Sequence, residues 1–477
     1  KCVEALGSKD EEFIELQCLH YIGHEELLAQ SIKNLSRRTM CNSESSLKDD
    51  LSLLDALMEE DIEVDNLKKI LALKFRISDK IILDKVAGGV ESMNCSGNES
   101  TEVSHETCPP VKTNKITSTS AKDEQFLLHR FNTFIDSLDI PVRKIEAALV
   151  GEGMRMGVVA KEDINEEEIY LSINSNSVIN ADTAEAEGKP RINSILDQLR
   201  TLSRDGGLDV LLLFLLHEKF VLKEKSKWAA YINILPTIDQ MKLSAPLFFD
   251  DSIYDYAAGS DLRPSLIRNK RKAEDLFVAF SLNKDIMKVL GPQVMQMDNF
   301  FWAYAIINSR SIWWNGKRHL VPLLDLVNCM ELQNSAGDKT SVHKTFLDQS
   351  KHAVTKASTN FTKGDQLFEN YGQPNYVYYM YHGFTLGDEN SHDCARLGGL
   401  AITSSDRGAV NLKETQRKLS NDGFNSMNPS FCVKDASSLD RITKFLQIKH
   451  GAQTVLEVQP QLREFLRDRI KRYSMTK

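Results

Sequence analysis

Residues 367–384 carry the side chains with the clearest capacity for chemistry. They read LFENYGQPNYVYYMYHGF, with five tyrosines and no charged residue after Glu369. Aromatic rings can wall an apolar slot and attract a cation, and a tyrosine hydroxyl at the end of such a slot can hydrogen-bond an amine. Tyr371 stands between an asparagine and a glycine, which predicts that its ring emerges at a turn. Packing in a core helix is the alternative for the others taken singly: Tyr376, Tyr378, Tyr379 and Tyr381.

Two further stretches hold candidate binding residues. VPLLDLVNC places Asp325 and Asn328 where a buried strand would carry valine or leucine. A buried asparagine needs its amide satisfied, so it commonly orders a turn or holds a ligand; in isolation the turn is the more frequent role. GEGMRMGVVA sets three glycines between apolar strands, where the backbone could approach a ligand, although a plain hairpin turn is the favoured interpretation. Its spacing is not that of the dinucleotide-binding motif.

The remaining pattern predicts an α+β protein that positions these residues. Residues 1–86 have helical periodicity, and 87–122 form a polar segment that we interpret as a disordered linker. Residues 123–390 combine short extended segments with helices, including a helical insertion at about 237–310. Residues 391–477 return to helices. Many short strands with inserted helices indicate a compact β core that carries helices.

Composition narrows the class of protein. Of the 477 residues, 42% are hydrophobic and 26% charged, as in ordinary globular proteins, and the net charge of -8 argues against a broad nucleic-acid-binding surface. No apolar run approaches the roughly 20 residues that a membrane span needs. Eight cysteines without a CxxC pair favour reduced thiols over a disulfide framework or a zinc site. We therefore expect an intracellular monomer that binds no nucleic acid, membrane or metal, with the cytoplasm favoured over the nucleus or an organelle.

Seven motifs in the same order resemble the SET-domain protein methyltransferases over roughly residues 140–390. More narrowly, they resemble the class of the Rubisco large-subunit lysine methyltransferase and the related actin-histidine methyltransferase. The motifs are RMGVVAKEDINEEE, WAAYINILP, APLFFDD, NSRSI, VPLLDLVNC, FTKGDQLFENYG and NYVYYMYHGF. The resemblance implies a SET-type β core with a helical insertion and S-adenosylmethionine as the cofactor.

The resemblance also implies roles for particular residues. Tyr371 would be the catalytic residue, at the junction of the cofactor pocket and a channel for the target side chain. Asn328 would order the amino-acid end of the cofactor, with Arg310 near its carboxylate. The implied cofactor-binding residues are Met156, Gly157, Arg310, Asp325, Asn328, Cys329 and Tyr371, and the implied substrate-binding residues are Tyr376, His382 and Phe384.

The substrate implied by the resemblance is a lysine of a non-histone protein. Histone-directed SET enzymes commonly carry zinc-binding cysteine clusters, and these eight cysteines form none. The chain departs from the family where Cys329 replaces its histidine and where GEGMRMG replaces a tighter glycine turn. These departures keep open the alternative of a catalytically silent SET-like binding module, and the resemblance to the actin-histidine methyltransferase keeps open that of a protein-histidine methyltransferase.

The helical ends of the chain have a place in the same comparison. Residues 391–477 fit the position of the substrate-binding helical domain of this class. Residues 67–86, LKKILALKFRISDKIILDKV, resemble the last helices of that domain. One hypothesis is that the chain begins with the tail of a preceding copy, as in a tandem or fused protein.

Overall fold

The computed structural model describes residues 121–474 with short gaps, and three isolated helical positions, Lys69, Ala72 and Arg76. The gaps are 152–153, 188–206 except Ile195, 341, 343–344, 388–389, 404, 407–411, 425 and 435–437. The predicted helical segment 1–86 and the predicted linker 87–122 lie outside the described residues, apart from those three positions and the first two residues of helix α6 (Ala121–Asp136). The inference about a preceding copy lies outside them as well.

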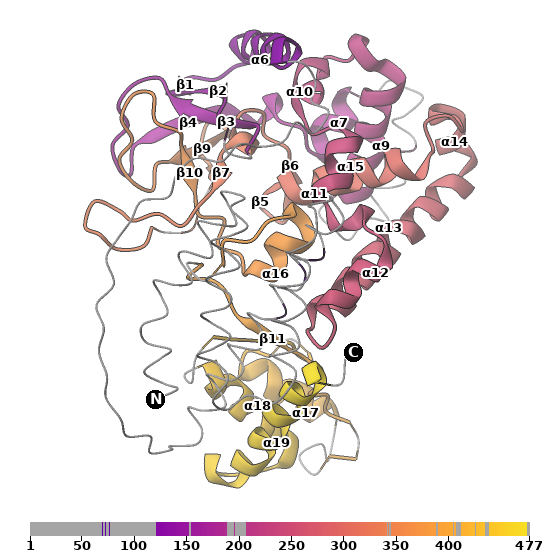
Figure 1. The fold of residues 1–477 in the computed structure, drawn as a ribbon, viewed down its shortest axis with the longest axis vertical. Helices are drawn as coiled ribbons and strands as arrows, with labels where there is room; N and C mark the ends of the chain where they lie inside the picture. The colour runs from indigo at the N-terminus through magenta and orange to yellow at the C-terminus, as the bar shows by residue number, and fades with distance from the viewer. Residues whose placement is uncertain are drawn as a thin grey trace, which may run out of the picture.

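The β part consists of one four-stranded antiparallel sheet and several strand pairs (Figure 1). The sheet has the order β1 (Val142–Arg143), β4 (Ile169–Asn174), β9 (His352–Lys356) and β8 (Thr345–Leu347). Beside it, β2 (Ile145–Leu149) and β3 (Met156–Ala160) form an antiparallel hairpin. A second hairpin joins β5 (Ile312–Trp314) to β6 (Lys317–His319). The apolar strands expected on either side of the glycines of GEGMRMGVVA are confirmed.

A short parallel pair joins two motifs that are forty residues apart in the chain. Strand β7 (Asn328–Cys329) pairs with β10 (Phe368–Glu369), with Asn328 opposite Phe368. VPLLDLVNC is thus not one extended segment as expected: Leu323 has a φ of +77°, and a 3₁₀ helix, η6 (Leu324–Leu326), precedes β7. Because of the bend, Asp325 lies in the 3₁₀ helix and not in the strand. The β7–β10 pairing brings Tyr371 next to Val327, the residue before β7.

Helices fill the predicted insertion and share the main apolar cluster with the strands. The insertion comprises α11 (Ile238–Ser244), α12 (Asp251–Tyr254), α13 (Leu262–Leu282), α14 (Lys284–Leu290) and α15 (Met297–Arg310). Before it come α7 (Ala181–Glu187), α9 (Leu208–Leu216) and α10 (Ala229–Ile234). Every residue of α9 except Asp209 is buried, as its apolar sequence predicts. Thr237 and Gln240 form a reciprocal cap at the start of α11, just after Pro236 ends the preceding helix.

The tyrosine-rich segment is helical, so packing is the correct interpretation for part of it. Helix α16 (Asn375–Val377) continues into a π-helical turn, η7 (Tyr378–His382), which ends at Gly383 in the left-handed conformation. Tyr378 and Tyr379 are fully buried. A large apolar cluster fills the space between the sheet and the helices from Phe131 to Leu367. The α+β class is confirmed.

The C-terminal part has an apolar cluster of its own, drawn from residues 395–466. It contains α17 (Leu412–Asn421), α18 (Leu439–His450) and α19 (Val455–Ser474), and these helices lie at the opposite end of the molecule from the four-stranded sheet (Figure 1). An antiparallel pair, β11 (Ala395–Leu397) with β12 (Phe431–Val433), accompanies them. This pair was not expected from the sequence. The division into the predicted domains itself stays a prediction.

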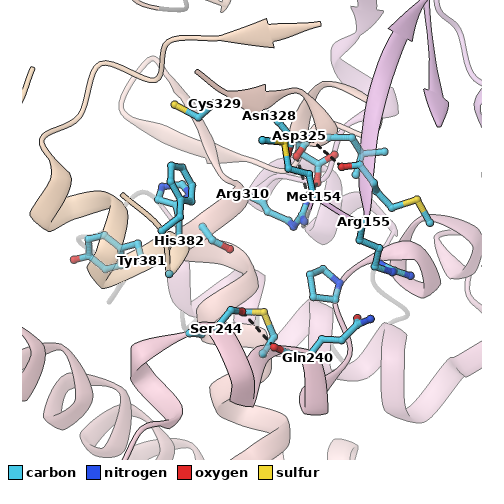
Figure 2. A pocket seen from close by; sticks show the side chains of 18 of the residues that line it. Met154, Arg155, Gln240, Ser244, Arg310, Asp325, Asn328, Cys329, Tyr381 and His382 are labelled. Carbon is cyan, nitrogen blue, oxygen red and sulfur yellow. Dashed lines mark hydrogen bonds and ion pairs between the residues drawn. The ribbon is translucent and has the colours of Figure 1, made fainter. Parts of the chain in front are cut away.

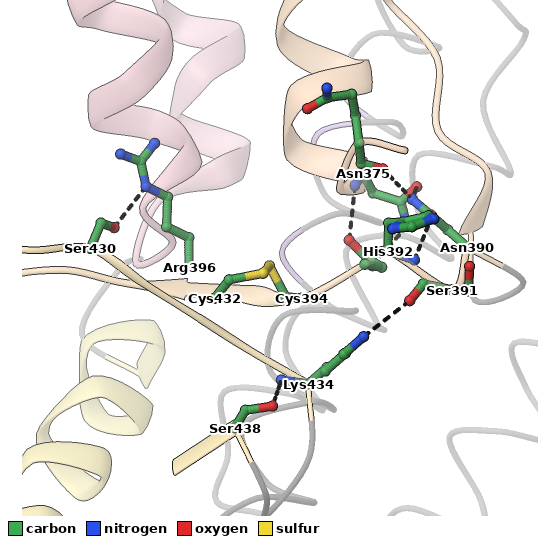
Figure 3. The surroundings of a disulfide bond; sticks show 12 residues. Asn375, Asn390, Ser391, His392, Cys394, Arg396, Ser430, Cys432, Lys434 and Ser438 are labelled. Atoms are coloured by element: carbon green, nitrogen blue, oxygen red, sulfur yellow. Dashed lines mark hydrogen bonds between the residues drawn. A yellow bond between two sulfur atoms is a disulfide. The ribbon is translucent and has the colours of Figure 1, made fainter. Parts of the chain in front are cut away.

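The expectation of reduced thiols is wrong for two of the eight cysteines. Cys394 and Cys432 form a disulfide whose Cα atoms are 5.3 Å apart, across the β11–β12 pair (Figure 3). They are 38 positions apart in the sequence, so only the strand register brings them together. Cys329 is a free, buried thiol. No group of metal-ligating side chains occurs within the described ranges.

Candidate active site

One cavity of about 550 Å³ gathers most of the residues that the sequence singled out (Figure 2). Its walls come from the β2–β3 hairpin, helix α11, the end of α15, the η6–β7 segment and the chain around Tyr371 and His382. The predicted residues that line it are Met156, Arg310, Asp325, Asn328, Cys329, Tyr371, His382 and Phe384. Gly157 and Tyr376 are not among its lining residues.

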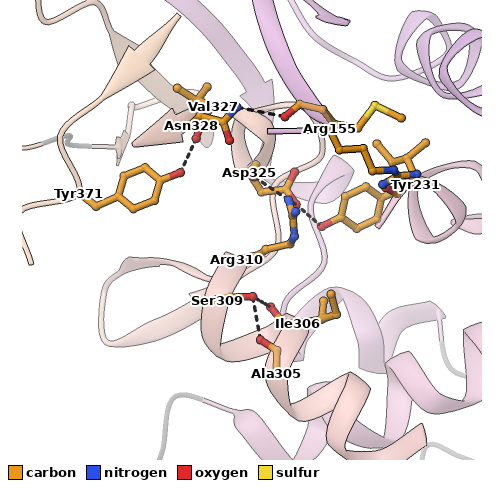
Figure 4. A network of polar contacts seen from close by, with 12 residues as sticks. Arg155, Tyr231, Ala305, Ile306, Ser309, Arg310, Asp325, Val327, Asn328 and Tyr371 are labelled. Carbon is orange, nitrogen blue, oxygen red and sulfur yellow. Dashed lines mark hydrogen bonds and ion pairs between the residues drawn. The ribbon is translucent and has the colours of Figure 1, made fainter. Parts of the chain in front are cut away.

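Tyr371 lies where the β7 and β10 segments meet. Its hydroxyl donates a hydrogen bond to the backbone carbonyl of Val327 (Figure 4). Burial raises the pKa of this phenol well above its ordinary value of 10, and Cys329 adds to the effect. The side chain is therefore a neutral phenol at any physiological pH, and its proton is directed to a fixed acceptor.

Arg310 and Asp325 form an ion pair at the base of the cavity. The Arg310 guanidinium donates to the Asp325 carbonyl at 2.9 Å and lies 3.4 Å from carboxylate oxygen Oδ2, which also accepts from the Tyr231 hydroxyl at 2.9 Å (Figure 4). The Asp325 side chain is 0% exposed. Burial raises its carboxyl pKa, and the charge of Arg310 opposes that rise. The second carboxylate oxygen, Oδ1, is buried without a hydrogen-bond partner within the described part of the chain.

The side chains of Asn328, Gln366 and Val150 lie close to the backbone of Gly157. The Asn328 amide donates to the Met156 carbonyl at 3.1 Å. A Cβ at position 157 would lie 2.9 Å from the Gln366 amide nitrogen, 3.0 Å from that of Asn328 and 3.0 Å from the Val150 side chain, so these side chains would have to shift. The favoured hairpin turn in GEGMRMGVVA is present, with Gly151 in it at a φ of +70°, but Gly157 lies inside β3 and not in the turn.

Aromatic rings form one wall of the cavity. The His382 ring lies 5.7 Å from the Tyr371 ring and 5.7 Å from the Phe384 ring, measured between ring centroids. Burial, followed by the charge of Arg310, lowers the pKa of His382 to about 4, so the imidazole is neutral at pH 7. Tyr378 stacks on Phe384 at 5.1 Å behind this wall. Tyr376 packs elsewhere, against a second apolar cluster and under the Arg396 guanidinium at 5.4 Å.

Cys329 is buried behind the same wall. Its sulfur lies 3.5 Å from the Tyr378 hydroxyl. Burial raises the thiol pKa to about 11, so the group is a protonated thiol at neutral pH. Its backbone, which pairs with Glu369 in the β7–β10 pair, is the part that builds the site.

The cavity also contains residues that the sequence did not reveal as site residues. These are Met154, Arg155, Pro236, Gln240, Met241, Leu243, Ser244, Ala245, Ser309, Leu326, Tyr381, Gly383 and Thr385. Arg155 is fixed by the Glu124 carboxylate at 2.8 Å and the Ile234 carbonyl at 2.7 Å. Nothing in the local sequence signals that α11 comes to face β3, because that contact depends on the whole insertion.

Comparison with known proteins gives relatives of one kind. No protein-family model matches the chain. The Rubisco large-subunit N-methyltransferase of Pisum sativum is 25% identical over 262 residues, 52% of this chain and 49% of that protein. The fructose-bisphosphate aldolase-lysine N-methyltransferase of Arabidopsis thaliana is 29% identical over 188 residues, 38% of this chain and 35% of that protein. The chain thus spans about half or less of the length of these curated relatives.

Solved structures give the fold. The SET domain of the large-subunit methyltransferase (LSMT) bound to lysine and S-adenosylhomocysteine matches with a TM-score of 0.54 at 18% identity, covering 74% of this chain and 77% of that chain. The Rubisco LSMT bound to S-adenosylmethionine matches with a TM-score of 0.51 at 19% identity, covering 72% and 76%. The chain therefore has the SET-domain fold of these structures, and its resemblance to the Rubisco large-subunit methyltransferase class is confirmed.

Proposed function

We propose that this protein uses S-adenosylmethionine to methylate a lysine side chain of a non-histone protein. One observation carries the proposal: the Tyr371 hydroxyl, the Arg310–Asp325 pair and the Asn328 side chain share one cavity. The relatives named above act on Rubisco and on aldolase, two non-histone proteins, which supports the substrate class.

The residues of the cavity fit the proposed cofactor. Its volume of about 550 Å³ lies in the range of small-molecule sites. The cofactor has a carboxylate and an ammonium group at one end. Arg310 offers a cation for the carboxylate, and the unpartnered Asp325 Oδ1 is a buried acceptor of the kind that an ammonium group satisfies. When bound, the cofactor supplies a methyl group on a positively charged sulfur.

The chain's own residues would position the amine and exclude water. The Tyr371 proton is directed to the Val327 carbonyl, so the phenol oxygen keeps lone pairs to accept from the amine. Neither Tyr371 nor His382 can act as a general base at neutral pH. The phenol of Tyr371 stays protonated because its pKa is raised, and the imidazole of His382 binds a proton only weakly because its pKa is about 4. The lysine must therefore lose its proton to solvent before it enters, and the aromatic wall then holds the neutral amine in a dry site.

Tyr371→Phe tests the catalytic role. Losing the hydroxyl should lower the rate of methyl transfer at least about tenfold, roughly 1.4 kcal/mol of barrier. Binding of S-adenosylmethionine, measured by calorimetry, should stay close to that of the parent. Tyr376→Phe is the matched control, because it makes the same change on a ring outside the cavity. Equal turnover by the parent and the Tyr371 variant would refute the assigned role.

A catalytically silent binding module is the rival, and the replacement of the family histidine by Cys329 favours it. The same calorimetric titration decides: an enzyme should bind the cofactor at micromolar levels, whereas a silent module should give no binding heat. Incubation of cell lysate with labelled S-adenosylmethionine then identifies the substrate. Hydrolysis of the labelled band separates methyllysine, which we expect, from methylhistidine, which would assign the histidine reaction.

The compartment is part of the same proposal. Two of the curated relatives are chloroplastic by name. No described helix combines the length and apolar character that a membrane crossing requires. The Cys394–Cys432 disulfide suits an organelle better than the reducing cytosol. We propose an organelle in place of the cytoplasm that the cysteine spacing favoured, and imaging of a tagged full-length chain tests this assignment.

A further inference from the structure

A second cleft, of about 440 Å³, lies between the insertion helix α13 and the C-terminal part of the chain. Helix α13 and the turn before it contribute Asp261, Pro264 and Arg268 to its lining. The C-terminal part contributes Arg396, Gly398, Gly399, Asn428, Pro429, Ser430 and Arg469. None of these residues lines the cavity described above, so this cleft is a separate feature of the molecule.

The charge of this cleft is opposite to that of the whole protein. Its lining has three arginines and one aspartate, a sum of 3 − 1 = +2, whereas the chain as a whole carries -8. The positive charges come from two parts of the chain and repel each other. An anion bound in the cleft would reduce this repulsion. Asp261 and Arg469 form an ion pair within the cleft at 3.2 Å.

The guanidinium groups are held in place by the fold. The side chain of Arg469 is 5% exposed. Arg396 donates from Nε to the Ser430 hydroxyl at 2.8 Å (Figure 3), and its guanidinium lies over the Tyr376 ring. Arg268 donates to the Ser265 hydroxyl at 2.9 Å. The contacts of Arg396 and Arg469 fix the planes of these two guanidinium groups before any ligand arrives, which lowers the entropy cost of binding.

The two glycines keep the floor of the cleft open. A Cβ at Gly399, whose φ is +86°, would lie 2.9 Å from an Arg469 guanidinium nitrogen. A Cβ at Gly398 would lie 3.2 Å from the Asp261 carboxylate and 3.7 Å from the Ser430 hydroxyl. Side chains here would occupy the space between the charged groups, so the glycines leave room for a ligand against the backbone.

We propose that this cleft binds a phosphate group. Guanidinium groups match phosphate oxygens through paired hydrogen bonds, and three of them with a serine hydroxyl suit a tetrahedral oxyanion. The net lining charge of +2 balances the charge of about -1.5 to -2 that a phosphomonoester carries close to neutral pH. It is larger in magnitude than the charge of one carboxylate. Because it joins residues of α13 to the C-terminal part, bound phosphate also ties these two parts together.

The test uses the full chain and does not depend on methyl transfer. Melting temperature is measured in sodium phosphate and in sodium chloride at matched ionic strength, with the apparent phosphate affinity from a titration. Because phosphate also stabilises proteins by exclusion from their surface, the supporting result is a rise in the melting temperature of the parent in phosphate that is larger than the rise in the Arg268→Gln variant. Arg268→Gln should weaken phosphate binding at least about tenfold, because it removes one of the three guanidinium groups that line the cleft. Arg271→Gln, which removes the same charge from the same helix outside the cleft, should bind like the parent.

The outcomes divide cleanly. Equal melting temperatures of the parent in the two salts, or an equal phosphate affinity of the Arg268 and Arg271 variants, overturns the proposal. Arg396→Lys should retain part of the affinity for phosphate, because lysine keeps the positive charge but lacks the paired N–H donors of a guanidinium group.

Glycerol phosphate and a phosphoserine heptapeptide distinguish the source of the phosphate. Tighter binding of glycerol phosphate assigns the cleft to a free metabolite, and tighter binding of the peptide assigns it to a phosphorylated protein side chain. Binding of neither probe refutes the site. Because every readout is a binding or melting measurement, this result is independent of whether Tyr371 proves catalytic.

Discussion

Gly383→Ala should be among the most disruptive single-methyl changes in the protein. Gly383 ends the π-helical turn with a φ of +76°, and a Cβ there would lie 2.0 Å from the Ser244 backbone oxygen. The left-handed conformation costs an alanine about 1–2 kcal/mol. The contact falls 1.0 Å short of the 3.0 Å below which Cβ atoms are essentially never found, and the atom it meets is backbone, which cannot rotate away. Relief by moving α11 against η7 costs a further amount of about 1–3 kcal/mol, as in overpacked cores.

The expected loss is therefore about 2–5 kcal/mol of unfolding free energy. Urea unfolding at 25 °C, followed by tryptophan fluorescence, measures it. Gly316→Ala is the matched control, because Gly316 has a similar φ of +70° but nothing within 4 Å of its Cβ position. The control should lose only the conformational part, about 1–2 kcal/mol. If the Gly383 variant loses no more than the control, the contact with Ser244 is not a constraint and the reasoning fails.

The same substitution should reach the cavity. Ser244 and Phe384, on the two sides of the contact, both line it. Separating them by about the missing 1.0 Å widens the site between α11 and the aromatic wall. Cofactor affinity measured by calorimetry should fall in the Gly383 variant and stay unchanged in the Gly316 variant.

Three further predictions concern buried polar groups and the disulfide. His319 stacks on Trp314, and burial lowers its pKa from 6.5 to about 4. As the pH falls, the imidazole is therefore protonated in the unfolded chain before it is protonated in the folded protein. The contribution of the neutral imidazole to the free energy of unfolding is fully present above pH 6.5 and is lost as the pH falls to 4, by at most about 3 kcal/mol. His319→Gln should flatten the urea-unfolding profile in that window, and an unchanged slope would contradict the shift. Asp325→Ala should lower unfolding free energy by about 3–5 kcal/mol, because it leaves the Arg310 charge without its carboxylate; a loss below 1 kcal/mol measured in urea would contradict the pairing. Reduction of the disulfide should cost about 2–4 kcal/mol and release two thiols, detected by thiol titration, whereas Cys432→Ser should show no further loss of stability on reduction.

Helices were the most predictable part of the structure, because their signal is local. The all-apolar run of α9, the proline that follows α10 and the amphipathic pattern of α13 each depend on neighbouring residues alone. The β2–β3 hairpin was predictable for the same reason, since its glycine-containing turn lies between two apolar runs. Periodicity contains this information without reference to the rest of the chain.

The site was only partly predictable, because it depends on contacts between distant segments. Strands β7 and β10 have two residues each, too few for any periodic signal, yet their pairing brings Tyr371 to Val327. Among the tyrosines, the sequence could not tell which would face the cavity: Tyr381 lines it, whereas Tyr376 lies under Arg396. A π-helical turn changes the direction of each side chain after position 377, so the ordinary helical period gives the wrong faces there.

Cys329 is the clearest departure from the motifs that the chain resembles, and its surroundings explain why the proposed methyl transfer is compatible with it. The strand pairing that builds the cavity uses the backbone at this position, opposite Glu369, and does not require a histidine side chain. A thiolate would be a hazard, because it is a stronger nucleophile than an amine and could take the methyl group itself. Burial prevents this by raising the thiol pKa to about 11, which keeps the proton on sulfur at neutral pH. A buried, protonated thiol beside Tyr378 therefore acts as a small apolar side chain, and the groups that would bind the cofactor and the amine, Arg310 and Tyr371, stay in place around it.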